Sequence, residues 1–555
     1  GKIVPERKNP VNRFLIAAYR PVINVVLRHR MATIAIALVA LFASVWPASR
    51  LGSEFMPTLN EGTLLYMPAS LPGMSVTKAS ELLQQQDRII KGFPEVESVF
   101  GKAGRALTAT DPAPLEMFET VINLKPEDQW RDGMTTDKLI AEMDAALKFP
   151  GVANSWTMPI KARTDMLATG IRTPVGIKLF GNDLAQLDAL ATEIEAVVRE
   201  VPETTSAFAE RLTGAYYLDI TPDLGRLAQY GVTLGEVQDV VAAALGGEMV
   251  TTILQGRERF SAIVRYPREL RDDPHRIGTQ VLVPVPGGAQ VPLGELARIE
   301  VTMGAPSIRT ENAMLAAYIY VDTRESDLGR YVKAAQEAVA EQVQFPPGYY
   351  VTWSGQYEYM QRAAEKMRVV VPVTLALIFL LLYLNFRRVT ESLIVMLSVP
   401  FALVGGVWLM WLLDYNTSVA VIVGFIALAG VAAETGVVML IYLDHALEAR
   451  AVQRQAEDRS LDAGDLREAI IEGAVDRVRP KMMTVVAIMA GLLPIMWSSG
   501  TGSEVMRRIA APMVGGMVSS TVLTLVVIPA LYSLIKQRQL ARKPPTPAAL
   551  PVDVP

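Results

Sequence analysis

Hydrophobic and polar positions divide the chain into a long polar region and six strongly apolar runs. An apolar run of roughly 20 residues is long enough to cross a bilayer core. One run lies near the amino terminus and five follow residue 368, so the pattern predicts a helical membrane bundle of one plus five spans. The predicted spans are Met31–Leu51, Val369–Phe386, Glu391–Leu413, Thr417–His445, Lys481–Ser499 and Met506–Ile535.

The polar region between the first two spans, residues 53–368, alternates between strand-like and helix-like patterns. Runs such as Gly62–Met67 and Phe118–Leu124 predict strands, and Ser75–Lys91 has the period of an amphipathic helix. The order is β-α-β-β-α-β and it occurs twice, which predicts two ferredoxin-like α+β subdomains. The second subdomain is assigned strands at Pro174–Phe180, Tyr216–Ile220, Ala317–Val321 and Tyr350–Ser354.

Short strands and turns at 222–315 interrupt the second subdomain and predict an inserted subdomain.

Residues 1–30 are predicted to form an amphipathic helix on the membrane surface, because residues 9–29 combine an apolar face with Arg13, Arg20 and Arg28. The other divisions are the first span (31–52), the first α+β subdomain (53–160), the two parts of the second (161–221 and 316–368), the insertion (222–315), the five-helix bundle (369–536) with a loop at 446–480, and a Pro-rich disordered tail (537–555).

Arginine and lysine residues flank the spans unevenly, and short loops rich in them mark the cytoplasmic side of a membrane. Most of them border the side that holds the loop 446–480 and the tail. This bias predicts that residues 53–368 lie outside the cytoplasm. Arg507 and Arg508 are exceptions, because they begin the last span on the opposite side.

Composition excludes several classes of protein. The chain has 555 residues, no cysteine, three histidines and a net charge of −4. These values exclude a disulfide framework and a Cys/His zinc site, and they show no electrostatic footprint for nucleic acid. The sequence has no GxxxxGK[ST] phosphate loop, so ATP hydrolysis is not predicted. A membrane enzyme is disfavoured because no nucleophile–base–acid arrangement is found.

Glu434 lies well inside the apolar run Thr417–His445. A carboxylate at membrane depth costs several kcal/mol unless it is protonated, paired or hydrated, so it is a candidate functional residue. Small residues surround it, as is typical where helices pack closely. We interpret Glu434 as a buried proton-relay residue; the alternative is an acid that faces a lumen for packing reasons. For Lys481, at the start of the next predicted span, the structural interpretation is an anchor that snorkels to the membrane interface.

Methionine is abundant, with 24 residues. Thioether ligands select Cu(I) over harder cations, and Ag(I) is the soft homologue of Cu(I). Methionine also fills gaps in cores, and a lone methionine is more often core than ligand. Met67 closes a predicted strand, Met117 opens another, and Met166 lies in the linker between the two subdomains. Each of them, taken alone, is interpreted as core.

Long strings spread over nearly the whole chain have a more specific pattern. They are NEGTLLYMP (60–68), ATDPAPLEMFET (109–120), RTDMLATGI (163–171), SGQYE (354–358), GFIALAGVAAETGVVML (424–440), RVRPKMMT (477–484) and GSEVMRRIAAPMVGG (502–516). The chain resembles the C-terminal half of a heavy-metal efflux transporter of the resistance-nodulation-division (RND) family, copper/silver CusA type. The resemblance implies a protein about twice this length, whose first half is not in this sequence.

The resemblance implies roles for particular residues. It places Met67, Met117 and Met166 in a three-methionine metal site in the cleft between the subdomains. The matching charged cleft positions are Glu61, Asp111, Glu119 and Arg163, for which a solvated rim is an equally good interpretation. Met249 and Met506 match weaker metal-relay positions, each with a partner in the absent half. Glu434 and Lys481 match a proton relay that also uses an aspartate of the absent half.

The implied function is proton-driven export of Cu(I) or Ag(I) across the bacterial inner membrane, by a secondary transporter and not an enzyme. The metal is the transported substrate, and no cofactor is expected. Expected partners are the N-terminal half, further copies in a homotrimer, a periplasmic adaptor, an outer-membrane channel and membrane lipid. Two alternatives stay open. An exporter of zinc, cobalt or nickel is disfavoured by the lack of histidine in the cleft strings. A non-transporting membrane scaffold would not need Glu434.

Overall fold

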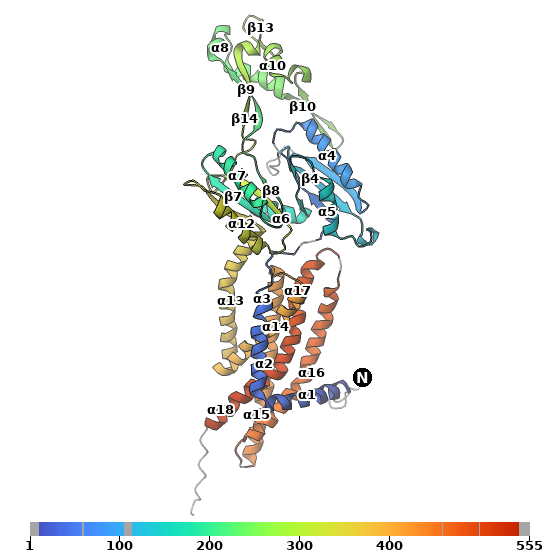
Figure 1. Ribbon diagram of the computed structural model, residues 1–555, viewed down its shortest axis with the longest axis vertical. Coiled ribbons are helices and arrows are strands. Elements are labelled where there is room, and N and C mark those ends of the chain that lie inside the picture. Colours follow the sequence, from blue (N-terminus) through green and yellow to red (C-terminus); the bar gives the residue numbers. More distant parts are fainter. Residues whose placement is uncertain are drawn as a thin grey trace, which may run out of the picture.

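The computed structural model describes residues 10–57, 60–70, 72–104, 114–457, 459–498 and 500–542, with side chains described from residue 12 to residue 540. Three parts follow one another along its long axis (Figure 1): a helical bundle, a pair of α+β subdomains, and a smaller subdomain at the far end. Asp111 and the tail beyond residue 542 lie outside the described residues.

Six helical segments of the described chain are long and apolar enough to cross a membrane, in the predicted arrangement of one plus five. They are α2 (Arg30–Ala43) with α3 (Val45–Ala48), α13 (Gln356–Phe386), α14 (Val389–Leu412), α15 (Val419–Ala456), α16 (Ala463–Met496), and α17 (Ser503–Val522) continued through a π-helical turn at Leu523–Val527 into α18 (Ile528–Arg542). Helix α1 (Pro10–Arg28) lies across the end of the bundle that is remote from the sheets (Figure 1).

Glycines bring α14 and α17 into backbone contact. A Cβ atom on Gly405 would lie 2.1 Å from the carbonyl oxygen of Gly515, and one on Gly406 would lie 2.9 Å from that of Pro512. No larger side chain fits at such distances. Small residues at membrane-helix interfaces allow this close approach, which maximises van der Waals contact.

Helices α15 and α16 extend well beyond their apolar runs, so the predicted loop at 446–480 is wrong in its secondary structure. Only residues between Ala456 and Ala463 connect the two helices. Asp462 caps α16 by accepting a hydrogen bond from the Asp465 backbone N–H at 2.7 Å. The segment is polar because its helices face solvent, and polarity alone does not separate such helices from loops. Helix α18 likewise makes residues 537–542 helical rather than part of a tail.

The first α+β subdomain has the predicted ferredoxin-like topology. Its strands and helices are β1 (Thr63–Tyr66), α4 (Val76–Lys91), β3 (Val96–Ala103), β4 (Phe118–Leu124), α5 (Thr136–Ala146) and β6 (Trp156–Thr157). The strands pair antiparallel in the order β3-β4-β1-β6. This is the order in which a β-α-β-β-α-β unit places its two outer strands on either side of the central pair.

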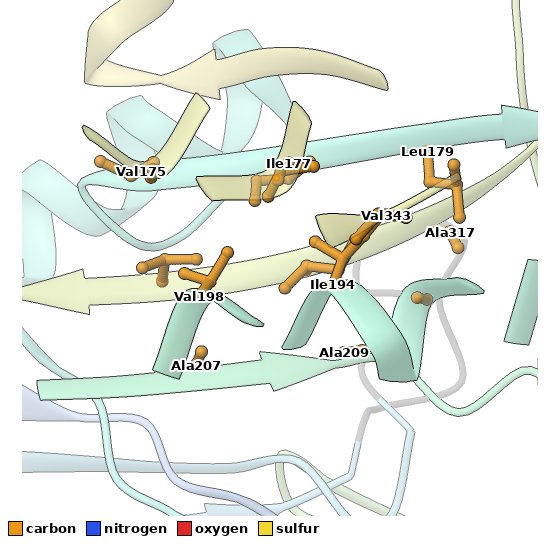
Figure 2. Packing of buried hydrophobic residues seen from close by; sticks show 14 of the residues in the cluster. Val175, Ile177, Leu179, Ile194, Val198, Ala207, Ala209, Ala317 and Val343 are labelled. Atoms are coloured by element: carbon orange, nitrogen blue, oxygen red, sulfur yellow. The ribbon is translucent and has the colours of Figure 1, made fainter. Parts of the chain in front are cut away.

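The second subdomain repeats this topology with one strand that sequence analysis missed. Its elements are β7 (Val175–Gly181), α7 (Leu184–Arg199), β8 (Thr204–Ala209), β16 (Met314–Thr323), α12 (Leu328–Gln342) and β17 (Tyr350–Gly355). Strand β8 pairs with β16, and β7 lies between β16 and β17. Figure 2 shows the apolar side chains between sheet and helices, among them Ile177, Ile194 and Val198, all of them buried.

The predicted strand Tyr216–Ile220 does not belong to that sheet. It lies in β9 (Ala215–Pro222), which pairs with β14 (Ala297–Gly304) in a two-stranded ribbon that leads to the inserted subdomain (Figure 1). Its aromatic residues are typical of a buried strand, but Tyr216 is 67% exposed. The insertion therefore begins at β9 and not at residue 222. It also contains α8 (Leu224–Tyr230), α9 (Leu234–Val241), the hairpin β10 (Glu248–Gln255) and β11 (Glu258–Val264), α10 (Pro274–Gln280), β12 (Leu282–Pro284), β13 (Gln290–Pro292) and α11 (Leu293–Leu296).

Strand β17 continues into membrane helix α13 without a linker. The junction residue, Gly355, has φ +80°, and a Cβ atom there would lie 2.8 Å from the carbonyl oxygen of Pro174. The backbone N–H of Gln356 donates to that same oxygen at 3.0 Å. Only glycine adopts this conformation at such a close contact without strain.

Candidate metal site and proton-relay residues

The structure brings the three predicted methionines into one apolar cluster. Met67 follows β1, Met117 precedes β4, and Met166 lies on α6 (Pro159–Thr169). Met67 and Met117 are buried and Met166 is partly buried, and all three belong to a cluster with Leu65, Val121 and Ala162. The three methionines therefore converge from two adjacent strands and the helix beside them. Met67 and Met166 are 99 positions apart in the sequence.

Met166 lies on a helix and not in the linker that the sequence pattern predicts. Pro159 occupies the first turn of α6, and Gly170 ends the helix with φ +77°. Proline just inside a helix start and glycine just past its end are the usual boundary signals. The sequence carried both signals, and the short length of α6 concealed them. The helix fixes the direction in which Met166 projects.

The chemistry of the cluster favours a soft monovalent cation. Three thioether sulfurs among aliphatic side chains offer no charge and no proton to displace, a donor set that suits Cu(I) and its homologues. Among the described residues, no group of three histidines, cysteines or carboxylates is placed to hold a metal ion. Metal ligation by Met67, Met117 and Met166 stays a prediction.

Glu61 holds the start of α6. Its two carboxylate oxygens accept hydrogen bonds from the backbone N–H groups of Ile160 at 2.9 Å and Lys161 at 3.1 Å. These are donors that a helix leaves unpaired in its first turn. The carboxylate also favours the positive end of the helix dipole. Glu61 therefore positions the helix that carries Met166, a role the sequence did not reveal.

The other predicted cleft charges behave differently. Glu119 on β4 forms an ion pair with Lys102 of β3 at 3.0 Å. Arg163 is exposed on α6, and Asp111 lies outside the described residues. Of the two weaker methionine candidates, Met249 is 62% exposed on β10 and Met506 is 48% exposed on α17. Neither belongs to the three-methionine cluster.

A buried polar junction lies behind α6, and sequence analysis missed it. The carboxylate of Asp165 on α6 accepts hydrogen bonds from Lys161 at 2.9 Å and from Gln356 of α13 at 3.5 Å. Nearby, burial raises the pKa of Asp322 to about 6, although the Ser155 and Ser206 hydroxyls and two neighbouring cations oppose that rise. These residues come from both subdomains, so only the fold brings them together.

Glu434 lies on a face of α15 that the described chain leaves exposed, and its place in a proton relay stays a prediction. Lys481 is instead fully buried in α16, and its Nζ atom has no hydrogen-bond partner among the described residues. The snorkelling interpretation of Lys481 is therefore wrong. Sequence analysis placed Lys481 at the start of a span, whereas α16 begins at Ala463. No ion pair joins Glu434 to Lys481 within the described chain.

A second buried ionic cluster lies at the end of the bundle near α1. The Nζ atom of Lys536 lies 3.0 Å from Glu391 and 3.3 Å from Asp444, and the Tyr532 hydroxyl donates to Asp444 at 2.5 Å. These residues come from α14, α15 and α18. Sequence analysis missed this cluster. The signal that could have indicated it is the charged Glu391 in the first turn of an apolar helix.

Comparisons with known proteins agree with this geometry. Residues 4–536 match the AcrB/AcrD/AcrF family. The chain is 50% identical over 535 residues to the cation efflux system protein CusA of Escherichia coli (strain K12), covering 96% of this chain and 51% of that protein. It is 35% identical over 546 residues to the cobalt-zinc-cadmium resistance protein CzcA of Cupriavidus metallidurans, covering 97% of this chain and 50% of that protein.

A solved structure gives the same result for the fold. The crystal structure of a heavy metal efflux pump (crystal form II) superposes with a TM-score of 0.83 at 28% identity, covering 96% of this chain and 52% of that chain. The chain thus spans about half the length of the relatives it matches. By fold, sequence and family match, it belongs to the AcrB/AcrD/AcrF family of RND transporters, in the CusA-type heavy-metal efflux branch.

Proposed function

We propose that this chain is the C-terminal half of a proton-driven Cu(I)/Ag(I) exporter. The observation that carries the proposal is the convergence of Met67, Met117 and Met166 in one cluster with aliphatic neighbours. Neutral sulfur donors discriminate against hard and borderline divalent ions, which prefer oxygen and imidazole nitrogen. The relation to CusA, at 50% identity, supports the same substrate class.

Proton flow is the energy source in this proposal. Lys481 is buried in the bundle without a hydrogen-bond partner, and Glu434 is an acid at the depth of the apolar run. A buried, unpaired ammonium is costly, so it is the kind of group that exchanges its proton or its partner during a transport cycle. The exposed face at Glu434 is where a carboxylate from the N-terminal half would complete the relay.

The proposed placement is the bacterial inner membrane, with residues 53–368 in the periplasm and α1 on the cytoplasmic face. The bias of basic residues toward the α1 end supports this orientation. The proposed assembly is a homotrimer of complete transporters with a periplasmic adaptor and an outer-membrane channel. Met249 and Met506 would extend the metal path, each with a methionine of the other half. Arg163, exposed on α6, would line the cleft mouth.

Export of divalent metals is the alternative that the CzcA relation favours. Titration calorimetry of the complete transporter in detergent with Ag(I) and with Zn(II) separates the two. We expect Ag(I) to bind far more tightly. Zinc binding of equal or greater affinity would reject the soft-metal assignment.

Glu434→Gln tests the proton coupling. Glutamine preserves size and hydrogen bonding but cannot change charge, so Ag(I) transport driven by a pH gradient in proteoliposomes should stop while Ag(I) binding persists. Lys481→Met should act in the same way. Wild-type transport rates in Glu434→Gln would show that this carboxylate does not carry the proton. Absence of Ag(I) transport in the unmodified transporter would favour the scaffold alternative.

A further inference from the structure

A large polar cavity lies at the α1 end of the bundle, between α1, α15 and α16. Its volume is about 800 Å³. Three arginines, one from each helix, and three acids of α16 line it: Arg20, Arg450, Arg479, Glu468, Glu472 and Asp476. A cavity of this size with so many hydrogen-bonding groups holds water, because a single water needs only about 10–15 Å³ and two to four polar partners.

The lining of this cavity includes the sequence neighbour of the buried lysine. Pro480, the residue before Lys481, lines the cavity, as does Tyr442 of α15. Arg477 lies one helical turn from Lys481 on the same face of α16, since residues four apart are neighbours along a helix. The guanidinium of Arg477 lies 5.8 Å from the centroid of the Tyr442 ring. Its Nε atom is buried and has no hydrogen-bond partner among the described residues.

Arg477 therefore lies between Tyr442, which lines the cavity, and the buried Lys481. Glycine at position 473 allows α15 and α16 to lie close together here, because a Cβ atom there would lie 2.7 Å from the Tyr442 carbonyl oxygen. On the far side, Arg477 and Lys481 both lie within the electrostatic field of Glu434. A fixed positive charge at this position opposes the passage of a proton as hydronium.

We propose that the cavity between α1, α15 and α16 is the cytoplasmic mouth of the proton path, and that Arg477, placed against Tyr442, is the positioning residue that closes this mouth toward Lys481 and Glu434. The proposal rests on the proposed proton-coupled function and adds its exit route and its barrier. Glu468 is already paired with Arg450. Glu472, in the cavity wall, receives protons released past Arg477 and passes them to bulk water. No covalent step is involved.

Loss of the Arg477 charge tests the barrier. Arg477 lies one helical turn from Lys481, which is about 5–6 Å between Cβ atoms. At about 6 Å and an effective dielectric constant of about 20, a unit charge changes an equilibrium by roughly a hundredfold. In proteoliposomes of the complete transporter without metal, Arg477→Gln should raise proton leak under a pH gradient by at least about tenfold. Arg477→Lys should restore tight coupling. Arg467→Gln is the matched control, since Arg467 is exposed on the same helix and does not line the cavity.

Cysteine labelling tests the mouth without removing Arg477. This chain has no cysteine, so Glu472→Cys introduces a defined target in the cavity wall. A membrane-impermeant thiol reagent added on the cytoplasmic side should label it and slow metal transport several-fold. Gln453→Cys, exposed on α15 outside the cavity lining, should be labelled with no effect on transport, and the parent transporter without the added cysteine should be unaffected.

The outcomes separate this inference from the function on which it rests. If Glu434→Gln abolishes coupled transport while Arg477→Gln shows no leak and labelled Glu472→Cys transports normally, the exit route is wrong and the proton-driven function stands. If Glu434→Gln transports normally, the proposed coupling itself fails. Leak in Arg477→Gln that Arg477→Lys does not reverse would show a packing defect and would overturn the barrier role.

Discussion

Glu61 accepts a hydrogen bond from the backbone N–H of Lys161 at 3.1 Å, across almost the full length of the first subdomain's sequence. Its second oxygen accepts from Ile160, so one carboxylate satisfies two donors at the start of α6. This contact links the segment before β1 to the helix that carries Met166. The predicted metal site therefore depends on a residue that donates no ligand atom.

Glu61→Ala should loosen the cluster without removing a sulfur. Loss of a capping side chain costs about 0.5–2 kcal/mol, and part of this cost should appear as weaker Ag(I) binding because Met166 is less well placed. Glu61→Gln should have a smaller effect, since its amide oxygen can still accept one bond. Titration calorimetry with Ag(I) measures both. Glu119→Ala, which breaks only a partly exposed ion pair, should leave binding nearly unchanged.

Met67→Leu, Met117→Leu and Met166→Leu should each abolish or strongly reduce silver resistance. Leucine conserves volume and costs less than about 1.5 kcal/mol in a core, so only the thioether is lost. Growth on silver, with the amount of transporter in membranes checked, is the measurement. Met143→Leu is the control, because Met143 is fully buried in the separate core of the first subdomain. Normal silver resistance in all three variants would show that these methionines only fill the core.

Gly405→Ala should destabilise the bundle. The added Cβ atom would lie 2.1 Å from the Gly515 carbonyl oxygen, so α14 and α17 must separate, at a cost typical of overpacking, about 1–3 kcal/mol or more. Gly430→Ala on α15 is the matched control, since its Cβ atom would meet nothing within 4 Å. Thermal denaturation in detergent should show a lower midpoint only for Gly405→Ala, and equal midpoints would contradict the backbone contact.

Asp322 should make stability depend on pH. Burial raises its pKa from the usual 3.8 to about 6 in the folded protein. The folded state therefore binds more protons than the unfolded state between these values, and this residue's contribution to stability is lost as the pH rises through 6. The full effect is on the order of 3 kcal/mol. Asp322→Asn should raise the denaturation midpoint relative to wild type at pH 7 and not at pH 4. A constant difference across that range would rule out titration of Asp322.

Periodic patterns predicted most of the fold. Six apolar runs gave six spans, and alternating strand and helix patterns gave two ferredoxin-like subdomains, because burial on one face leaves a direct mark on the sequence. These patterns gave wrong predictions where a strand is buried without large apolar residues, or where apolar residues are exposed. Strand β8, TTSAFA, is built from small residues with little alternation, while the exposed β9 carries Tyr216, Tyr217 and Leu218. The polar ends of α15 and α16 looked like a loop because they face solvent.

The candidate site was predictable only through resemblance. Nothing in local spacing distinguishes Met67, Met117 and Met166 from the buried core residue Met143; their convergence requires the pairing of β1 with β4 and the position of α6. Glu434 and Lys481 show the reverse case. Depth in an apolar run indicated Glu434, and the resemblance indicated Lys481. Which of them is buried depends on neighbouring helices, and Lys481 is the one that the described chain covers.

The junction at Gly355 has a mechanical consequence. Strand β17 borders β7 in the second subdomain, and α13 begins at the very next residue, with the joint held by the Gln356 N–H bond to Pro174. There is no slack between them to absorb a rotation. A tilt of this sheet, such as one that widens the space around Met166, must reappear as a tilt of α13 within the bilayer. We therefore expect movement of this subdomain to be transmitted to the bundle through α13.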